Sequence, residues 1–127
     1  MANPISYTIK IGTVGELLVQ LRLLQYGVQA APPLKDSGND LIALRGHAIR
    51  CVQVKTGTQG VPKWPCKKKL YHLLAIVHLE GEGSDLDLNH STVYLLSKEE
   101  VDRAGREWEA LEGFKLNEQR IKELFCE

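Results

Sequence analysis

The stretch NDLIALRGHAIRCVQVK, residues 39–55, decides the fold expected for this chain. Its apolar residues fall into two segments that suit β-strands, and Gly46 and His47 separate these segments. Glycine is favoured at the first position of a two-residue type II′ turn. The stretch therefore predicts two antiparallel strands, residues 40–45 and 48–55, joined in a tight hairpin.

The register of this hairpin determines which polar side chains share a face. With a two-residue turn, Asp40 lies opposite Gln53, and Lys55 projects from the same face because it is two residues further along. Burying an acid, an amide and an amine together is costly unless they satisfy one another, so the cluster is a candidate site. A structural ion pair between Asp40 and Lys55 is the alternative. A turn one residue longer would separate Asp40 from Gln53.

Apolar residues occupy both faces of the predicted hairpin near its turn. We therefore expect other elements to cover both faces, with the polar cluster at the open end of one of them. The face of the polar cluster carries Ile42, Leu44, Ile49 and Cys51, and the opposite face carries Leu41, Ala43, Val52 and Val54.

The residues before the hairpin predict a helix that ends at Gly27. Thr13 and Glu16 match a capping box, so the helix is expected to begin there, after a short strand or extended segment at residues 5–11. Gly27 suits the left-handed conformation that follows many helix C-termini. In this interpretation Glu16 is explained as a capping residue. A short strand is expected at residues 28–31.

The residues after the hairpin predict further strands and two helices. We expect strands at residues 71–79 and 92–96, with acidic residues 80–89 as the loop between them. Ser97 and Glu100 form a second capping box, which begins a helix extending to about Leu111. Asn117 caps a last helix that ends near Cys126. The fold class expected is α/β, with a mixed β-sheet flanked by helices.

The composition indicates a single globular domain over residues 1–127. Lys and Arg total 16, Asp and Glu also total 16, and 43% of the residues are hydrophobic. There is no run of roughly 18–20 apolar residues for a membrane span and no signal peptide pattern. The three cysteines form no C-x-x-C pair. We therefore expect a cytoplasmic protein that contacts no membrane, and the absence of a P-loop or dinucleotide fingerprint predicts no nucleotide cofactor.

The zero net charge hides an uneven distribution along the chain. Residues 1–79 contain ten bases and three acids, a net charge of +7, while residues 80–127 contain six bases and 13 acids, a net charge of −7. A basic part in a small domain is compatible with a face that binds nucleic acid. The alternative is that folding brings the halves together so that the charges cancel locally.

The loop after the hairpin combines an aromatic residue with several lysines. Lysines bind phosphates without reading sequence, and an exposed tryptophan can stack on a base or enter a groove. A solvated loop with the tryptophan folded onto the core is the alternative. The candidate nucleic-acid-binding residues are Lys63, Trp64, Lys67, Lys68 and Lys69.

Together these residues resemble the PD-(D/E)xK nuclease superfamily, whose fold is restriction endonuclease-like. The resemblance rests on Glu16 in the first helix, Asp40 at the start of a hairpin, and Gln53-Val54-Lys55 on its second strand, and it spans residues 12–96. Residues 37–39 stand where the superfamily often has proline. Gln53 replaces the usual second acid, and this Gln-x-Lys version is similar to that of intron-encoded homing endonucleases in the superfamily.

The resemblance implies a Mg²⁺ site, with Mn²⁺ as an alternative ion, and a catalytic set of Glu16, Asp40, Gln53 and Lys55. Asp40 would be the central metal ligand, with the Gln53 amide oxygen and the Val54 backbone carbonyl as further ligands. Lys55 would orient the attacking water or stabilise charge on the phosphate. Glu16 would ligate the metal through water or hold Lys55 in place.

Three functions follow from these observations. The first is a metal-dependent DNA endonuclease that acts as a homo-oligomer, since one small unit offers one site while cutting both strands needs two. The second is a catalytically degenerate nuclease fold that binds nucleic acid or a protein partner without cleavage, because Gln53 removes a negative charge from the site. The third is a structural or interaction domain that binds no nucleic acid.

Overall fold

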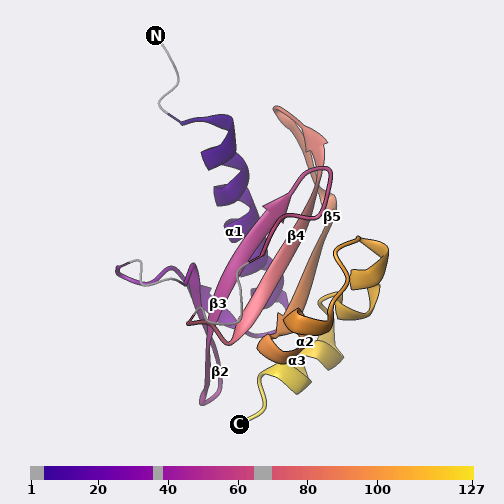
Figure 1. Ribbon diagram of the computed structural model, residues 1–127. Coiled ribbons are helices and arrows are strands. Elements are labelled where there is room, and N and C mark those ends of the chain that lie inside the picture. Colours follow the sequence, from indigo (N-terminus) through magenta and orange to yellow (C-terminus); the bar gives the residue numbers. More distant parts are fainter. Residues whose placement is uncertain (1–4, 36–38, 65–69) are drawn as a thin grey trace.

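The computed structural model describes residues 5–35, 39–64 and 70–127 of the chain. A mixed five-stranded sheet has the strand order β1-β2-β3-β4-β5, in which β3 and β4 are parallel and the other neighbours are antiparallel. The elements in order are α1 (Tyr7–Gln25), β1 (Gln29–Ala31), β2 (Leu41–Arg45), β3 (Ala48–Gly57), β4 (Leu73–Glu82), β5 (Asp85–Ser97), α2 (Lys98–Arg103), the 3₁₀-helix η1 (Glu109–Phe114) and α3 (Glu118–Leu124). Figure 1 shows α1 and α2 on different sides of the sheet.

The hairpin of β2 and β3 has the register that the sequence predicts. Arg45 pairs with Ala48, so Gly46 and His47 are the whole turn. Gly46 has φ +60, and no other residue type in the described part of the chain has a positive φ. A positive φ at the first turn residue alone is the signature of a type II′ turn, which explains the glycine.

Helix α1 begins earlier than the sequence predicts. Ser6 is its N-cap and accepts a hydrogen bond from the Ile9 amide at 3.2 Å, so Thr13 and Glu16 lie inside the helix. The predicted capping box at Thr13 and the extended segment before it are therefore wrong. A helix that begins after Ser6 has almost two more turns than one that begins after Thr13, and so forms more backbone hydrogen bonds. The predicted end is confirmed, since Gly27 has φ +81 and its amide and that of Val28 close a Schellman motif.

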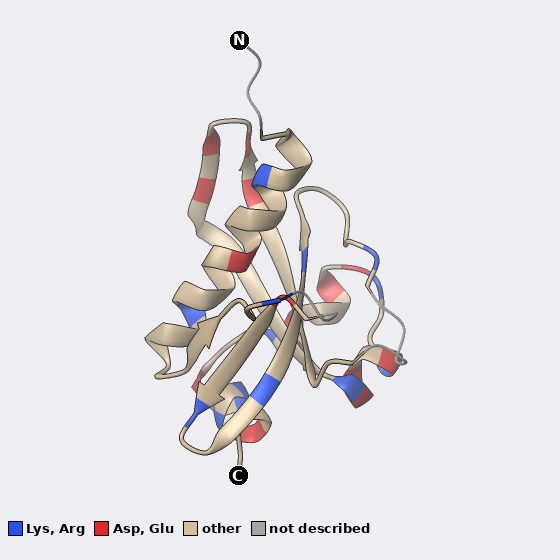
Figure 2. Cartoon of the chain, turned by 90° about the vertical axis from the view of Figure 1, so that its left-hand side faces the viewer, with Lys and Arg blue, Asp and Glu red and all other residues tan. Residues whose placement is uncertain are grey.

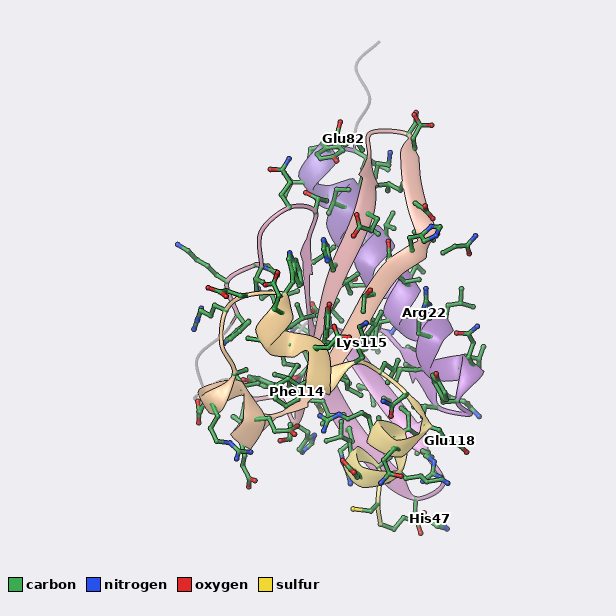
Figure 3. All side chains as sticks on the ribbon, turned by 90° about the vertical axis from the view of Figure 1, so that its right-hand side faces the viewer. Arg22, His47, Glu82, Phe114, Lys115 and Glu118 are labelled. Atoms are coloured by element: carbon green, nitrogen blue, oxygen red, sulfur yellow. The ribbon has the colours of Figure 1, made fainter. Side chains whose placement is uncertain are left out.

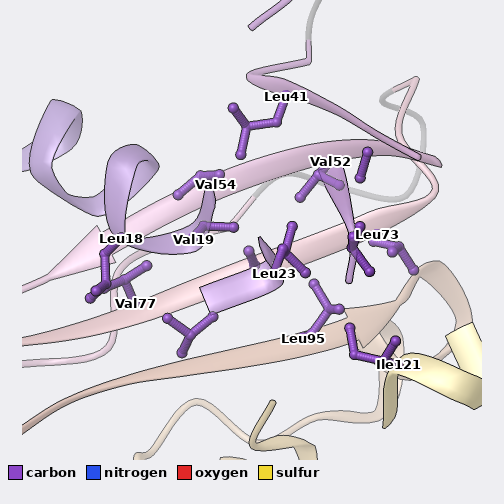
Figure 4. Close-up of a cluster of buried hydrophobic side chains, with 14 of the residues drawn as sticks. Leu18, Val19, Leu23, Leu41, Val52, Val54, Leu73, Val77, Leu95 and Ile121 are labelled. Atoms are coloured by element: carbon purple, nitrogen blue, oxygen red, sulfur yellow. The ribbon is translucent and has the colours of Figure 1, made fainter. Parts of the chain in front are cut away.

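Two apolar clusters hold the sheet between its helices. The larger cluster packs α1 and α3 on one sheet face, and Figure 4 shows Leu18 and Leu23 of α1 against that face with Ile121 of α3 nearby. The smaller cluster packs α2 and η1 on the opposite face, over β4 and β5. Strand β4 is buried on both faces in its first half, as its continuous apolar run predicts.

The sequence predicts that other elements cover both faces of the β2–β3 hairpin, but its outer face is exposed. Ile42, Leu44 and Ile49 are 42%, 39% and 57% exposed. The smaller cluster lies over β4 and β5, so among the described residues nothing packs on this part of the sheet.

The C-terminal third also departs from the prediction at two places. Residues 80–89 form the ends of β4 and β5 in a long hairpin rather than a loop, with a register shift between His78 and Glu80. Helix α2 ends at Arg103 rather than near Leu111, because Ala104 is extended and η1 follows as a separate turn. The predicted caps at Ser97 and Asn117 are both confirmed.

Candidate active site

A cavity of about 400 Å³ lies where α1 passes the free edge of β3. Strand β2 begins at Leu41, opposite Val52, so no strand among the described residues pairs with the last residues of β3 on that side. The cavity contains every predicted catalytic side chain. Its lining residues are Tyr7, Thr8, Ile11, Gly12, Glu16, Asp40, Gln53, Val54, Lys55, Thr56 and Thr58.

Asp40 continues the pairing of β3 beyond the end of β2. Its amide donates to the Val52 carbonyl at 3.0 Å, and its carboxylate oxygen Oδ2 accepts from the Val54 amide at 2.8 Å. The same oxygen accepts from Nε2 of Gln53 at 2.7 Å. These bonds fix the carboxylate against β3. Among the described residues Oδ1 of Asp40 accepts no hydrogen bond, so it remains available to a ligand.

Gln53 and Lys55 lie on the same side of β3, as the register predicts. The direct bond from Gln53 to Asp40 satisfies the amide that an apolar strand would otherwise leave unpaired. Lys55 lines the cavity but makes no salt bridge with Asp40, so the structural ion pair is absent. The cluster is held together by the carboxylate and the amide rather than by ion pairing.

Glu16 reaches the cavity from the middle of α1 because the helix packs closely on β3. Gly15 is buried, and a Cβ atom at this position would overlap the side chain of Thr56. Glycine therefore lets α1 approach the strand, which brings the next residue, Glu16, to the cavity wall. The hydroxyl oxygen of Thr56 is buried there and has no hydrogen-bond partner among the residues that the structure describes. Glu16 is not the capping residue that the sequence suggests.

The oxygen-rich lining fits a magnesium-type ion better than a zinc-type ion. The described residues contain no group of three His, Cys, Asp or Glu side chains suited to a metal. Asp40, Glu16 and the Gln53 amide oxygen are oxygen donors in one cavity, and the Val54 carbonyl points to the same strand edge as its amide. Mg²⁺ takes a few protein oxygens and keeps several waters, whereas zinc prefers nitrogen and sulfur.

The loop after β3 differs from its predicted form. Trp64 is only 8% exposed and packs in the smaller cluster, with the Arg106 guanidinium 4.5 Å from its ring centroid. The prediction of an exposed Trp64 is therefore wrong, because the apolar ring gains more from burial over β4 and β5 than from solvent. Lys63 is exposed. Lys67, Lys68 and Lys69 lie outside the described residues.

Sequence reasoning missed the contribution of the first turns of α1 to the cavity. Tyr7 and Thr8 line it, but residues 5–11 were expected to be extended. Ser6, a favoured N-cap residue before a long run without proline, is a sequence signal for this earlier start, but Thr13 is an equally acceptable cap locally. Thr56 and Thr58, just after Lys55, complete the lining from β3 and the following loop.

Comparison with known proteins supports the fold. No family model matches the chain, and no curated protein sequence matches it. In structure it is similar to a bacterial homing endonuclease, I-Ssp6803I, with a TM-score of 0.61 over 94% of this chain and 92% of that chain, at 16% sequence identity. The chain therefore has a restriction endonuclease-like fold, as the sequence resemblance predicts.

No helix in the described part of the chain is both long enough and apolar enough to cross a membrane.

Proposed function

We propose that the chain is a metal-dependent DNA endonuclease that hydrolyses phosphodiester bonds. The observation that carries this proposal is the convergence of Asp40, Gln53, Lys55 and Glu16 on one cavity at the free edge of β3. An open pocket with a fixed carboxylate, an amine and a second carboxylate suits phosphate chemistry. The shared fold with a homing endonuclease supports the same activity.

Each side chain has a role that its position supports. Asp40, with one oxygen held by β3 and the other without a hydrogen bond among the described residues, would hold Mg²⁺ together with the Gln53 amide oxygen and the Val54 carbonyl. The bound ion supplies charge neutralisation and a more acidic water. Lys55 orients the attacking water or stabilises charge on the phosphate. Glu16 would hold the ion through water or position Lys55.

DNA binding and assembly complete the proposal. Lys63 with Lys67, Lys68 and Lys69 follows β3 directly in sequence, so this loop is the proposed contact to the phosphate backbone. The burial of Trp64 leaves this role to the lysines. One candidate active site in the described part of the chain supports a homo-oligomer as the species that cuts both strands.

A non-cleaving nucleic-acid-binding protein is the second candidate, and Gln53 favours it. An amide in place of a second carboxylate removes one negative charge from the metal ligands, which weakens attraction for a divalent cation. In this alternative the cavity is retained and the lysines bind nucleic acid without hydrolysis.

Nicking of supercoiled plasmid with Mg²⁺ distinguishes the two candidates. The Asp40→Asn variant keeps an oxygen acceptor for β3 but removes the charge, so nicking should fall by at least about 100-fold while the fold is retained. Asp102→Asn, the same change at an exposed position in α2, should leave nicking intact. Absence of nicking by the wild-type protein, with salt-dependent DNA binding retained, would favour the second candidate.

A further inference from the structure

The outward surface of α1 carries no charged residue. Successive outward positions along the helix carry apolar or uncharged polar side chains. Four of them are apolar, and these are 55–60% exposed. We call this surface the α1 stripe. It consists of Ile9, Thr13, Leu17, Leu21 and Leu24.

The charged residues of α1 all turn away from the stripe. Lys10 donates to the Gly83 carbonyl at 2.7 Å, and Glu16 lines the candidate active site. Arg22 donates to the carbonyls of Leu88 and Ser91 at 3.0 and 3.2 Å, and Figure 3 shows it on the side of α1 that faces β5. In Figure 2 most of α1 is correspondingly free of charged positions. Lys and Arg with Asp and Glu make up 25% of the chain, so an uncharged solvent face over this length is unusual.

The opposite side of α1 is already buried against the sheet. Leu18, Val19 and Leu23 are at most 3% exposed and belong to the larger cluster. The helix is thus apolar on its inner and outer sides, a pattern typical of a helix buried all round. A surface helix that only faced water would carry polar residues at the outward positions.

We propose that the α1 stripe is the contact between two copies of this chain, with α1 of one copy packed on α1 of the other. In a contact about a two-fold axis a surface meets itself, so any charge near the axis would face an identical charge. The stripe avoids that repulsion because none of its residues is charged. A surface that binds a different partner has no such restriction and commonly uses complementary charge.

The size and shape of the surface suit this contact. The stripe runs over about 22 Å of helix at 1.5 Å per residue. Its four half-exposed apolar side chains present on the order of 400 Å², and the neutral residues beside them bring the surface towards the roughly 800 Å² that each partner contributes to a stable interface. A cavity of about 290 Å³ lined by Gln20, Leu21, Leu24, Gln29 and Ala30 adjoins the stripe and can receive side chains of the second copy.

This proposal specifies the surface used by the homo-oligomer in the proposed function, but it does not depend on catalysis. Its test needs neither metal nor DNA and can use the Asp40→Asn protein. A failure of nuclease activity would therefore leave the α1 contact standing, and a failure of the contact would leave the active-site assignment standing.

Sedimentation velocity between about 1 and 100 µM tests the contact. The wild-type chain should sediment as a dimer or larger assembly, and Leu17→Lys combined with Leu21→Lys should weaken self-association by at least about 100-fold, since each buried lysine would meet a like charge. Ile49→Lys is the matched control, because Ile49 and Leu17 are both 57% exposed but Ile49 lies on the outer face of β3. This control should associate like the wild type.

Two measurements keep the outcome decisive. Circular dichroism checks that the variants are folded, and Thr13→Arg, which adds charge to the stripe without removing an apolar side chain, replaces the double variant if that variant does not fold. A wild-type chain that is monomeric over the whole range would overturn the proposal. So would an assembly that Ile49→Lys dissociates and the folded stripe variants do not.

Discussion

At the scale of single residues, Asp40 both shapes the strand edge and faces the cavity. One carboxylate oxygen accepts hydrogen bonds from the Val54 amide and from the Gln53 side chain. The other accepts none from the described residues. These two bonds hold the Asp40 carboxylate at the edge of β3, where the Val54 amide pairs with this side chain instead of with β2. This arrangement requires an amide, or another donor, at position 53 when no cation is bound.

Restoring an acid at position 53 should make folding depend on the metal. In Gln53→Glu, two carboxylates meet where a donor now lies 2.7 Å from Asp40, so without metal the free energy of unfolding should fall by about 1–3 kcal/mol. Mg²⁺ should recover this loss, because it binds the folded state and neutralises the pair. Thermal melts with and without Mg²⁺ measure both effects.

Gln53→Met is the control for this prediction. It removes the same hydrogen bond without adding charge, so Mg²⁺ should not recover its loss of stability. Equal responses of the two variants to Mg²⁺ would show that position 53 does not contact the ion.

At the scale of elements, the site depends on how closely α1 packs on β3. The contact at Gly15 and Thr56 sets the separation of helix and strand, and Glu16 follows directly in the helix. The sheet supplies Asp40, Gln53 and Lys55 from one hairpin, but Glu16 joins them only through this packing.

A methyl group at Gly15 should therefore move the helix. Gly15→Ala should lower the free energy of unfolding by about 1–3 kcal/mol, because the added Cβ overlaps Thr56 in a packed contact. Urea unfolding measures the change.

Gly12→Ala is the matched control one turn earlier in the same helix. A Cβ at Gly12 meets nothing within 4 Å, so this variant should be more stable by about 0.5–1 kcal/mol through the better helix propensity of alanine. A Gly15→Ala protein as stable as Gly12→Ala would show that α1 can shift freely on β3.

At the scale of the whole molecule, one buried ion pair joins the C-terminal helices to the sheet. Both Arg120 and Glu100 have mostly buried side chains, and Arg120 donates to Glu100 at 2.7 and 3.0 Å and to the Leu95 carbonyl at 2.6 Å. Burial by itself raises the pKa of Glu100, but the hydrogen bonds from Arg120 and Ser97 outweigh it and hold this pKa below its usual value.

The stability of the chain should therefore depend on Glu100 in acid. A carboxyl whose pKa is lower in the folded state stabilises it above the unfolded pKa of 4.5, and this contribution is lost as the pH falls through the folded pKa. Glu100→Gln should lower the free energy of unfolding by about 1–3 kcal/mol at neutral pH, and the difference from wild type should shrink progressively below about pH 4.5. Denaturant unfolding at several pH values measures it.

Glu118→Gln is the control, because Glu118 is 76% exposed and lies 3.7 Å from Lys122. It should follow the wild-type pH profile. A constant difference between Glu100→Gln and wild type across the acid range would mean that the carboxylate charge contributes nothing.

In the folded chain, the acidic and basic residues are not separated as they are along the sequence, where residues 1–79 are basic and residues 80–127 are acidic. Glu80, Glu82, Asp85 and Asp87 gather on the β4–β5 hairpin, which Figure 2 shows beside the N-terminal end of α1. Glu80 and Glu82 line a second cavity that shares Tyr7 and Thr58 with the candidate active site. The acidic half of the sequence thus lies partly next to the basic half, so local charge at the site is more balanced than the sequence halves suggest.

The sequence by itself determined the β2–β3 hairpin, its register and the meeting of Asp40 with Gln53. These features follow from a glycine-led turn and the two-residue period of a strand, which are local rules. The end of α1 and the caps at Ser97 and Asn117 were predictable for the same reason.

Only the tertiary structure decided where α1 begins to contribute to the site, how far α2 extends and where Trp64 lies. Ser6 and Thr13 are both acceptable caps locally, and the choice between them depends on the packing of the whole helix on the sheet. The helix expected after Arg103 gives way to a turn in which the Trp108 ring stacks on His78 and its Nε1 donates to Gln59, contacts from distant parts of the chain. Long-range packing of this kind overrides local propensity, because burial involves more free energy than the small differences between local conformations.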